Sequence, residues 1–467
     1  MKKVCIIGAG ITGLAAAHRL AREQDSEITI IEQESVPGGL ARTVATKHCR
    51  SDLGPHRFNT EIDHVDSFIN EFAAPFLIAV PRRSRMLLGG NYLSYPPQPF
   101  DLFKNFGPLR TFGFIDSFLF RKLAGIFQRN EIHSFEDIME RAFGPELYRT
   151  IVYPYTKKVW GMEPSELSMD VAKVRVSAGG VGKLIQKTIL GTGKTHLNEF
   201  LYFKGGTQTL IDQFVNGIES NRGTLITGTK VVALTQEENT VRIVYKKKGK
   251  TQELAADYCI STIPLTDLCL MLLKIHRNTL VKGLLPEFKY IRLACVLIEV
   301  NKPHITDNSW LYFPEERVWI NRAYEAKNFD PSMCPEDKSI ICAEVSLNDE
   351  ARWKLSNEII ASNVIAQLAG TELFAESDVT DSRVVRLPHA YPIYDMEYKK
   401  RLSSVWQYLV QFPRIVTTGR QGLFHHNNMD HSIIMGQKAA ECVIGHDEPA
   451  HVWYDSLDQF ADLRIID

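Results

Sequence analysis

The sequence predicts an α/β fold that opens with a dinucleotide-binding βαβ unit, and the order of the first elements supports this prediction. An apolar strand over residues 4–7 leads into a Gly-x-Gly-x-x-Gly turn and then into a segment with helical spacing. A second apolar strand over residues 28–31 ends on Glu32. This order of strand, turn, helix, strand and acid is typical of a Rossmann-type fold.

Each glycine of the turn has a mechanical reason. Gly8 allows the tight turn, Gly10 lets the backbone approach a pyrophosphate, and Gly13 lets the helix pack closely on the strand. Residues 14–20 continue with helical spacing, and the pyrophosphate is expected at the positive end of this helix, beside Ile11 and Thr12 of the turn. We therefore expect these five residues to contact a dinucleotide.

Glu32 lies 19 positions after Gly13, where a carboxylate can hold the hydroxyls of the adenosine ribose. An acid at this position argues against a 2′-phosphate on that ribose. The alternative is an ordinary Gly-rich turn followed by a solvated glutamate, but the complete strand, turn, helix and strand order argues against it.

Length and motif order predict two interleaved domains, because 467 residues exceed the usual size of one core. Nucleotide-domain signals recur at three separated places. We expect a discontinuous cofactor domain and a substrate domain supplied by two insertions. The cofactor domain would comprise residues 1–80, 204–274 and 411–467, and the substrate domain residues 81–203 and 275–410.

Composition excludes several function classes. A formal net charge of −1 gives no broad attraction to nucleic acid or anionic lipid, so an anionic ligand needs local basic residues. The eight cysteines show no metal-ligand spacing, which fits a reducing compartment and predicts a cytoplasmic protein. The start of the chain on the first strand leaves no room for a signal peptide, and no apolar run is long enough to span a membrane. We expect no bound metal, because the pair His425 and His426 has neither helical pairing nor an acidic cluster nearby.

One segment invites a second interpretation. Residues Phe112 to Phe127 are rich in aromatic side chains with a few charges. We expect an amphipathic helix that faces the core, and the alternative is a helix that contacts a membrane surface or a hydrophobic ligand. Trp160 and Trp310 are expected to be packing residues.

Further motifs follow the first unit in a fixed order. They are EQESVPGGLART (32–43), DLGPHRF (52–58), KGGTQTL (204–210), CISTIPL (259–265), TTGRQGLF (417–424) and MDHSIIMGQKAAE (429–441).

Together these motifs resemble the superfamily of flavin-containing amine oxidases and protoporphyrinogen oxidases over essentially the whole chain. The resemblance implies FAD as the cofactor. It also implies a glutathione-reductase-like FAD domain with an inserted mixed α+β substrate domain. The residues implied to bind FAD, besides those of the first turn, are Glu32, Gln33, Gly39, Leu40, Ala41, Arg42, Gly54, Pro55, His56, Val231, Gly419, Arg420, Met429, Asp430 and Ser432.

Four stretches within this superfamily resemble the UDP-galactopyranose mutases and related sugar-nucleotide flavoenzymes. DLGPHRF implies that His56 lies beside the flavin ring. YTKKVWGMEPSELSMDVAKVRV implies a diphosphate-binding Arg175, and NSWLYFPEERVWINRAY implies a tyrosine, Tyr312, with a second diphosphate arginine, Arg322. HAYPIYD implies that Tyr391 lies over the sugar.

The residue types suit that assignment. Two guanidinium groups bind a diphosphate through charge-assisted bidentate bonds, and tyrosines offer hydroxyl groups with apolar faces. Alternatively, His56 is a hydrogen-bonded loop histidine, and each arginine forms a surface salt bridge.

The mutase resemblance implies an isomerase in which reduced FAD acts through N5 on the anomeric carbon, with no net redox change. Its substrate would be a nucleotide sugar, with NAD(P)H or another reductant as a possible partner and a homo-oligomer as a possible assembly. The shared FAD motifs support equally an oxidoreductase, an oxidase or desaturase of an amine, a porphyrinogen or another small molecule. A third class, a flavin-bearing binding protein without turnover, is disfavoured by the complete site. Pro55 and His426 depart from the mutase pattern, which leaves the sugar open.

Overall fold

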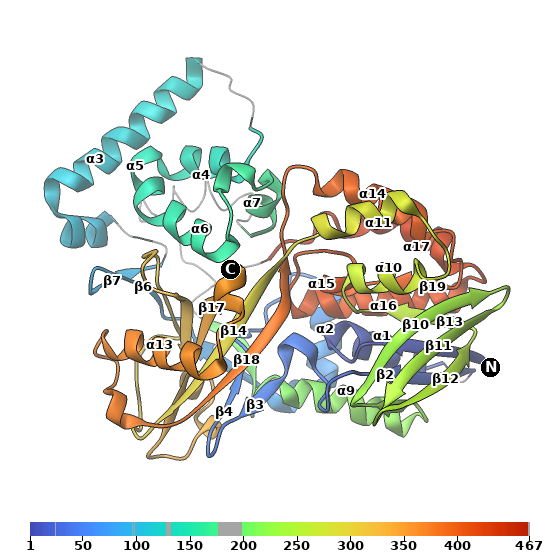
Figure 1. Cartoon of the computed structure of the whole chain (residues 1–467). Helices are drawn as coiled ribbons and strands as arrows, with labels where there is room; N and C mark the ends of the chain where they lie inside the picture. The colour runs from blue at the N-terminus through green and yellow to red at the C-terminus, as the bar shows by residue number, and fades with distance from the viewer. Residues whose placement is uncertain (24, 96, 98, 128–131, 176–198, 466–467) are drawn as a thin grey trace.

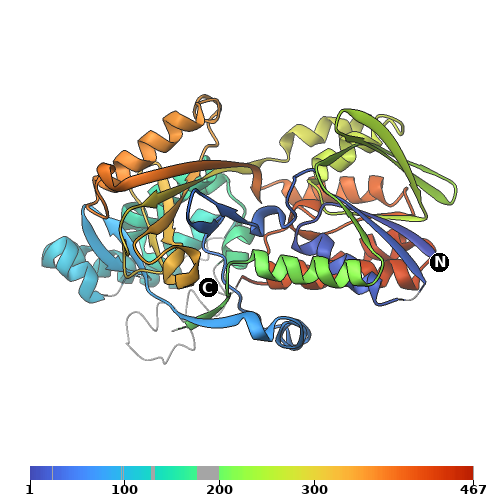
Figure 2. The same cartoon turned by 90° about the horizontal axis from the view of Figure 1, so that it is seen from below.

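The computed structural model describes residues 1–23, 25–95, 97, 99–127, 132–175 and 199–465. The chain forms two lobes that lie side by side (Figure 1). One lobe carries the N-terminus and a parallel sheet, and the other carries a large mixed sheet with a cluster of helices. The view from below shows the same two lobes (Figure 2).

A five-stranded parallel sheet is the framework of the first lobe. Its strands come from separate parts of the chain, namely β1 (Lys2–Ile7), β2 (Ser26–Ile31), β9 (Thr224–Ile226), β13 (Tyr258–Ser261) and β19 (Ile415–Thr417). The order is β19-β13-β1-β2-β9, and all neighbours are parallel. The buried residues Val4 to Ile7 explain the apolar start of the sequence.

Three helices pack on this sheet: α1 (Ile11–Ala21), α9 (Gln208–Ser220) and α16 (Met429–Gly445). Helix α1 approaches β1 closely, since a Cβ atom on Gly13 would lie 2.0 Å from the Gly8 carbonyl oxygen. It approaches α16 as closely, because a Cβ atom on Gly436 would lie 2.2 Å from the Thr12 carbonyl oxygen. Glycine at both positions therefore fixes the position of the turn between β1 and α1.

A seven-stranded sheet forms the second lobe. Its strands are β6 (Ser84–Leu88), β7 (Asn91–Ser94), β14 (Tyr290–Val300), β15 (Trp310–Tyr312), β16 (Ile320–Glu325), β17 (Ser339–Ser346) and β18 (Val379–Pro392). The order is β18-β14-β17-β16-β15-β6-β7. In this register Tyr312 pairs with Arg322, and Arg322 pairs with Glu344, so that the three side chains lie in one row across the sheet.

One face of this sheet packs against α13 (Asn357–Ala369) through a cluster of buried aliphatic side chains. The opposite face carries Trp310 and Tyr324 and turns toward the first lobe. The two faces alternate along each strand, as expected for a sheet that is buried on both sides.

A cluster of helices lies above β6 and β7 on the second lobe (Figure 1). They are α3 (Pro99–Phe127), α4 (Phe135–Phe143), α5 (Pro145–Leu147), α6 (Tyr153–Trp160) and α7 (Met169–Arg175). Helix α4 begins with a capping box between Ser134 and Asp137. Helix α3 bends at Gly107, whose φ of 75° breaks the helix just before Pro108.

The expected core-facing helix over residues 112–127 has a different orientation. Phe114 is buried, but the neighbouring apolar side chains form a stripe that faces outward. Its members are Leu109, Phe112, Ile115, Leu119 and Phe120, all at least 48% exposed. The helical spacing was predicted correctly, but the face that it buries was not. Among the described residues, no helix has the length and hydropathy needed to cross a membrane.

The remaining elements connect these frameworks. Gly228, with a φ of +61°, turns the chain between β9 and the following strand, β10 (Thr229–Glu237). The connecting strands are β3 (Thr43–Ala45), β4 (Arg50–Asp52), β5 (Leu77–Pro81), β8 (Glu199–Phe203), β10 (Thr229–Glu237), β11 (Thr240–Lys247) and β12 (Lys250–Ala256). The connecting helices are α2 (Asp63–Phe72), α10 (Leu265–Leu272), α11 (Thr279–Leu284), α12 (Glu350–Trp353), α14 (Tyr398–Leu409), α15 (Gly419–Gly422) and α17 (Pro449–Asp455).

Candidate active site

A cavity of about 1310 Å³ runs from the first βαβ unit to the second sheet. Its walls combine the turn between β1 and α1, the end of β2, the loop that follows β4, and the strands β15 to β18. Segments far apart in the sequence therefore meet around one cavity.

Glu32 lies at the end of the cavity that is formed by the turn between β1 and α1. This side chain is 6% exposed, and its two oxygens accept hydrogen bonds from the backbone N–H groups of Ala9, at 2.7 Å, and Glu34, at 2.8 Å. Burial raises the pKa of Glu32, while these backbone donors favour the charged form. The carboxylate is fixed beside the turn and still lines the cavity.

Most of the residues predicted to bind the cofactor lie along this cavity. The lining contains Gly8, Gly10, Ile11, Thr12, Glu32, Gln33, Gly39, Leu40, Ala41, Arg42, Gly54, Pro55, His56, Val231, Arg420, Met429 and Ser432.

Three predicted cofactor residues lie behind the lining. Gly13 packs on Gly8, as described above. Gly419 has a φ of +81°, and a Cβ atom there would lie 2.6 Å from Oγ1 of Thr12. Asp430 is 2% exposed at the start of α16, and burial raises its pKa to about 6. These residues shape the site without facing the cavity.

His56 occupies a tight loop in the middle of the cavity. The turn needs glycine before it, because Gly54 has a φ of +120° and a Cβ atom there would lie 2.6 Å from Oε1 of Glu344. The Gly54 carbonyl accepts a hydrogen bond of 2.8 Å from the His56 N–H. Within the described part of the chain, Nδ1 of His56 has no hydrogen-bond partner.

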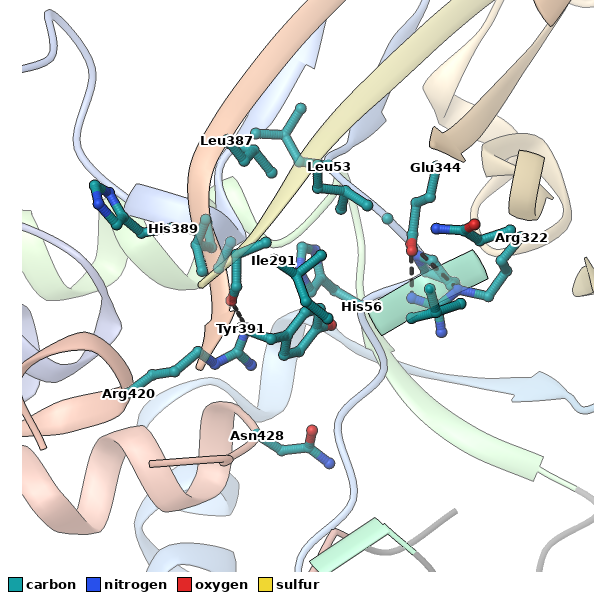
Figure 3. Close-up of a pocket in the computed structure, with 18 of the residues that line it drawn as sticks. Leu53, His56, Ile291, Arg322, Glu344, Leu387, His389, Tyr391, Arg420 and Asn428 are labelled. Carbon is teal, nitrogen blue, oxygen red and sulfur yellow. Dashed lines mark hydrogen bonds and ion pairs between the residues drawn. The ribbon is translucent and has the colours of Figure 1, made fainter. Parts of the chain in front are cut away.

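Two arginines flank His56 (Figure 3). Burial, followed by the positive charges of Arg420 and Arg322, lowers the pKa of His56 to about 3. The imidazole is therefore neutral at physiological pH, with one nitrogen available to a ligand.

Arg322 is paired inside the cavity. Its Nη2 lies 2.6 Å and its Nε 3.2 Å from Oε1 of Glu344, which is 5% exposed (Figure 3). The alternative that Arg322 forms a surface salt bridge is wrong in its location, because both residues line the cavity. Glu344 was not predicted as a site residue. It is the one acidic residue in the otherwise mainly apolar run of residues 339–347, and such an isolated acid could have indicated a buried polar role.

The predicted tyrosines flank this pair. Tyr312 packs on Tyr95, with ring centroids 4.5 Å apart, and on Tyr155, at 5.9 Å. Tyr391 lies under the guanidinium group of Arg420, 4.7 Å from its ring centroid. Both tyrosines line the cavity.

Arg420 is oriented by two backbone carbonyls outside its own helix. Its Nη2 donates to the carbonyl of Asn427 at 2.6 Å, and its Nη1 donates to the carbonyl of Ala390 at 3.3 Å. His426 is fully buried next to Tyr391, with ring centroids 6.1 Å apart, and lies outside the lining. Trp160 is buried against His426, as expected of a packing residue, and it also lines the cavity.

Residues 11–444 match the family described as flavin containing amine oxidoreductase. The chain belongs to this family. The protein is therefore an FAD-dependent enzyme, and the expected superfamily and cofactor are confirmed.

The relatives of this chain include both oxidases and sugar-nucleotide mutases. Protoporphyrinogen oxidase 2 of Arabidopsis thaliana is 23% identical over 95% of this chain and 94% of its own length. The dTDP-fucopyranose mutase of Escherichia coli is 29% identical over 37% of this chain and 45% of its own length. A crystal structure of reduced UDP-galactopyranose mutase superposes with a TM-score of 0.80 at 21% identity, covering 99% of both chains. This likeness confirms the expected α/β flavoenzyme fold.

The cavity fits FAD in several respects. A Cβ atom on Gly10 would meet nothing within 4 Å, so the backbone is open where the pyrophosphate is expected. Gly39 closes on the same place, since its Cβ atom would lie 3.3 Å from the Cα of Gly10. Glu32 is positioned for the ribose, and His56 offers an unpaired nitrogen farther along the cavity.

The structure does not test the role expected of Arg175. This residue is the last of α7, and its side chain lies outside the described residues. Its contact with a diphosphate therefore stays a prediction.

Within the described ranges, no group of three or more histidine, cysteine, aspartate or glutamate side chains is arranged to hold a metal ion.

Proposed function

We propose that this enzyme is an isomerase of nucleotide sugars that works with reduced FAD. One observation carries the proposal: beyond His56 the cavity contains Tyr312, Arg322 and Glu344 on three neighbouring strands, together with Tyr391 on β18. A guanidinium group flanked by tyrosines suits a diphosphate joined to a sugar. The mutase relatives and the shared fold support the same interpretation.

We assign FAD binding and substrate binding to separate parts of the chain. Residues 1–80, 204–274 and 411–467 hold FAD, and residues 81–203 and 275–410 form an inserted substrate domain. Bound FAD, once reduced, would supply a nucleophilic nitrogen that can displace the nucleotide from the anomeric carbon.

The chain's own residues bind and orient the substrate. Arg322 and Arg175 hold the diphosphate, so that the leaving nucleotide keeps its charge partners. Tyr312 and Tyr391 donate hydroxyl hydrogen bonds and present ring faces to the sugar or the base. His56 is neutral and can accept or donate one hydrogen bond beside the flavin ring. NAD(P)H or another reductant is the proposed source of electrons.

The test uses protein reduced with dithionite under anaerobic conditions. It is incubated with UDP-, dTDP- and GDP-hexoses, and the products are separated by anion-exchange chromatography. We expect a new isomer from at least one nucleotide sugar and no product from oxidised protein. Absence of turnover, together with absence of binding by every nucleotide sugar, would reject the proposal.

A second candidate is an oxidase, since the similarity to protoporphyrinogen oxidase extends over the whole chain. Such an enzyme would bleach its flavin with an amine or a porphyrinogen and recover the colour in air. In that case neither the unmodified enzyme nor the Arg322→Gln variant would bind a nucleotide sugar.

A further inference from the structure

Trp310 lies at a point of the cavity that contains two cationic side chains. Its indole is 3% exposed and belongs to the lining. The guanidinium carbon of Arg57 lies 5.5 Å from the ring centroid, and that of Arg82 lies 5.6 Å from it. Phe200 also packs on the indole, with a centroid separation of 5.8 Å. One buried ring is therefore shared by two positive charges.

The indole N–H of Trp310 has no hydrogen-bond partner among the described residues. A buried donor without a partner costs free energy, and buried indole N–H groups usually find an acceptor. A negatively charged acceptor at this point would accept from the N–H and would lie close to two guanidinium groups.

The residues around Trp310 are close in sequence to residues of the proposed reaction site. Arg57 directly follows His56, and Trp310 precedes Tyr312 by two residues on β15, so that both aromatic side chains lie on the same face of the sheet. Trp310 also pairs with Ser84 on β6, which follows Arg82 in the loop from β5. Three separate segments thus bring the two arginines to one indole ring.

We propose that Arg57, Arg82 and the N–H of Trp310 form an oxyanion subsite that binds an acidic group of the substrate. This inference rests on the proposed function, because it assumes a nucleotide sugar in the cavity. The acidic group is either the diphosphate or a carboxylate on the sugar, as in a nucleoside diphosphate uronate. The subsite then acts together with Arg322, which is paired with Glu344, in binding the negative charge of the substrate.

The test measures binding to the oxidised holoenzyme by isothermal titration calorimetry, with UDP-glucose, UDP-glucuronate and inorganic pyrophosphate. The variants are Arg82→Gln, which removes a charge, Arg82→Lys, which keeps it, and Trp310→Phe, which keeps the ring but removes the N–H. We expect Arg82→Gln and Trp310→Phe to lose at least tenfold in affinity and Arg82→Lys to retain most of it. Loss confined to UDP-glucuronate identifies a sugar carboxylate, whereas equal loss for UDP-glucose and pyrophosphate identifies the diphosphate.

The matched controls come from another tryptophan. The guanidinium carbon of Arg352 lies 4.9 Å from the ring centroid of Trp319, outside the cavity lining. Arg352→Gln and Trp319→Phe should leave all three affinities unchanged. In ¹⁵N spectra the indole resonance of Trp310 should move when the anion binds, and that of Trp319 should not.

The outcomes separate this inference from the proposed function. Nucleotide-sugar binding that is unaffected by Arg82→Gln and Trp310→Phe overturns the subsite and leaves the isomerase proposal standing. If no nucleotide sugar binds but pyrophosphate moves the Trp310 resonance, the oxyanion subsite stands without that function. If none of the three ligands moves the resonance, the subsite is rejected.

Discussion

Arg322 and Glu344 face each other on neighbouring strands, with Nη2 of the arginine 2.6 Å from Oε1 of the glutamate. The arginine assigned to the diphosphate therefore already has a carboxylate partner, and an incoming anion must share or displace it. Because of this pairing, we expect substitutions of the two residues to change UDP affinity in opposite directions.

Glu344→Gln should strengthen UDP binding roughly tenfold, because the guanidinium group is no longer neutralised by a carboxylate. Arg322→Gln should weaken UDP binding by about tenfold to a hundredfold, the usual cost of losing a charged hydrogen-bond partner. Isothermal titration calorimetry on the holoenzyme gives both values. Weaker binding in Glu344→Gln would contradict the idea that the glutamate competes with the ligand.

Gly436 allows α16 to contact the first helix. Gly436→Ala would place a Cβ atom 2.2 Å from the Thr12 carbonyl oxygen, so the helices must separate next to the pyrophosphate turn. We expect a loss of a few kcal/mol in unfolding free energy, and less FAD per chain as judged from absorbance near 450 nm.

The control for this change lies on the same helix. Gly445 has no atom within 4 Å of the added Cβ position, so Gly445→Ala should leave stability and flavin content unchanged or slightly raised. Equal flavin content in the Gly436→Ala protein would show that the helix contact does not position the FAD turn.

His56 makes stability depend on pH in a definite direction. Burial and the two arginine charges lower its pKa to about 3, against an ordinary value near 6.5. Between these values the unfolded chain binds more protons, so unfolding free energy falls as pH drops below 6.5, by up to about 1.4 kcal/mol per pH unit.

His56→Gln should make this dependence shallower below pH 6.5 and leave stability at pH 8 nearly unchanged. Urea unfolding of the flavin-loaded protein between pH 5 and 8 provides the measurement, with His446→Gln, at an exposed residue, as the control. An NMR titration of His56 with a midpoint near 6.5 would disprove the assigned environment.

Lys158 fixes the loop that joins the strands of Tyr312 and Arg322. Its Nζ lies within hydrogen-bond distance of four backbone carbonyls between Phe313 and Ile320, including those of Glu315 at 3.0 Å and Ile320 at 2.9 Å. Lys158→Met leaves these acceptors without a donor, so we expect at least a tenfold loss of UDP affinity and a lower melting temperature.

The neighbouring Lys157 provides the comparison for that change. It pairs with Glu163 at 2.8 Å instead of with the loop, so Lys157→Met should leave UDP affinity unchanged. Similar affinities for the Lys158→Met variant and the unmodified enzyme would show that the loop positions its two residues without the lysine.

The local parts of the site were predictable from the sequence, because their spacing alone defines them. Gly8, Gly10 and Glu32 belong to one βαβ unit of about thirty residues, and the backbone geometry of such a unit follows from its glycines. The loop at His56 was recognised through its resemblance to known flavoenzymes.

Contacts between distant segments could not be predicted in the same way. Glu344 meets Arg322 only because β17 pairs with β16, and that register depends on the whole sheet. The outward stripe on α3 was missed for a related reason: helical periodicity shows that one face is apolar but does not show which neighbour covers it. The cluster around Trp310 needs three segments to meet, and no short motif indicates it.

The most direct test of the central claim counts turnovers per flavin in a sealed cuvette. The enzyme is reduced once with dithionite, the excess is removed under anaerobic conditions, and a nucleotide sugar that binds is added while absorbance at 450 nm is recorded. An isomerase should convert many equivalents of sugar per FAD while the flavin stays reduced. Product formed only in step with a change in flavin oxidation state would contradict the claim and show a net redox enzyme.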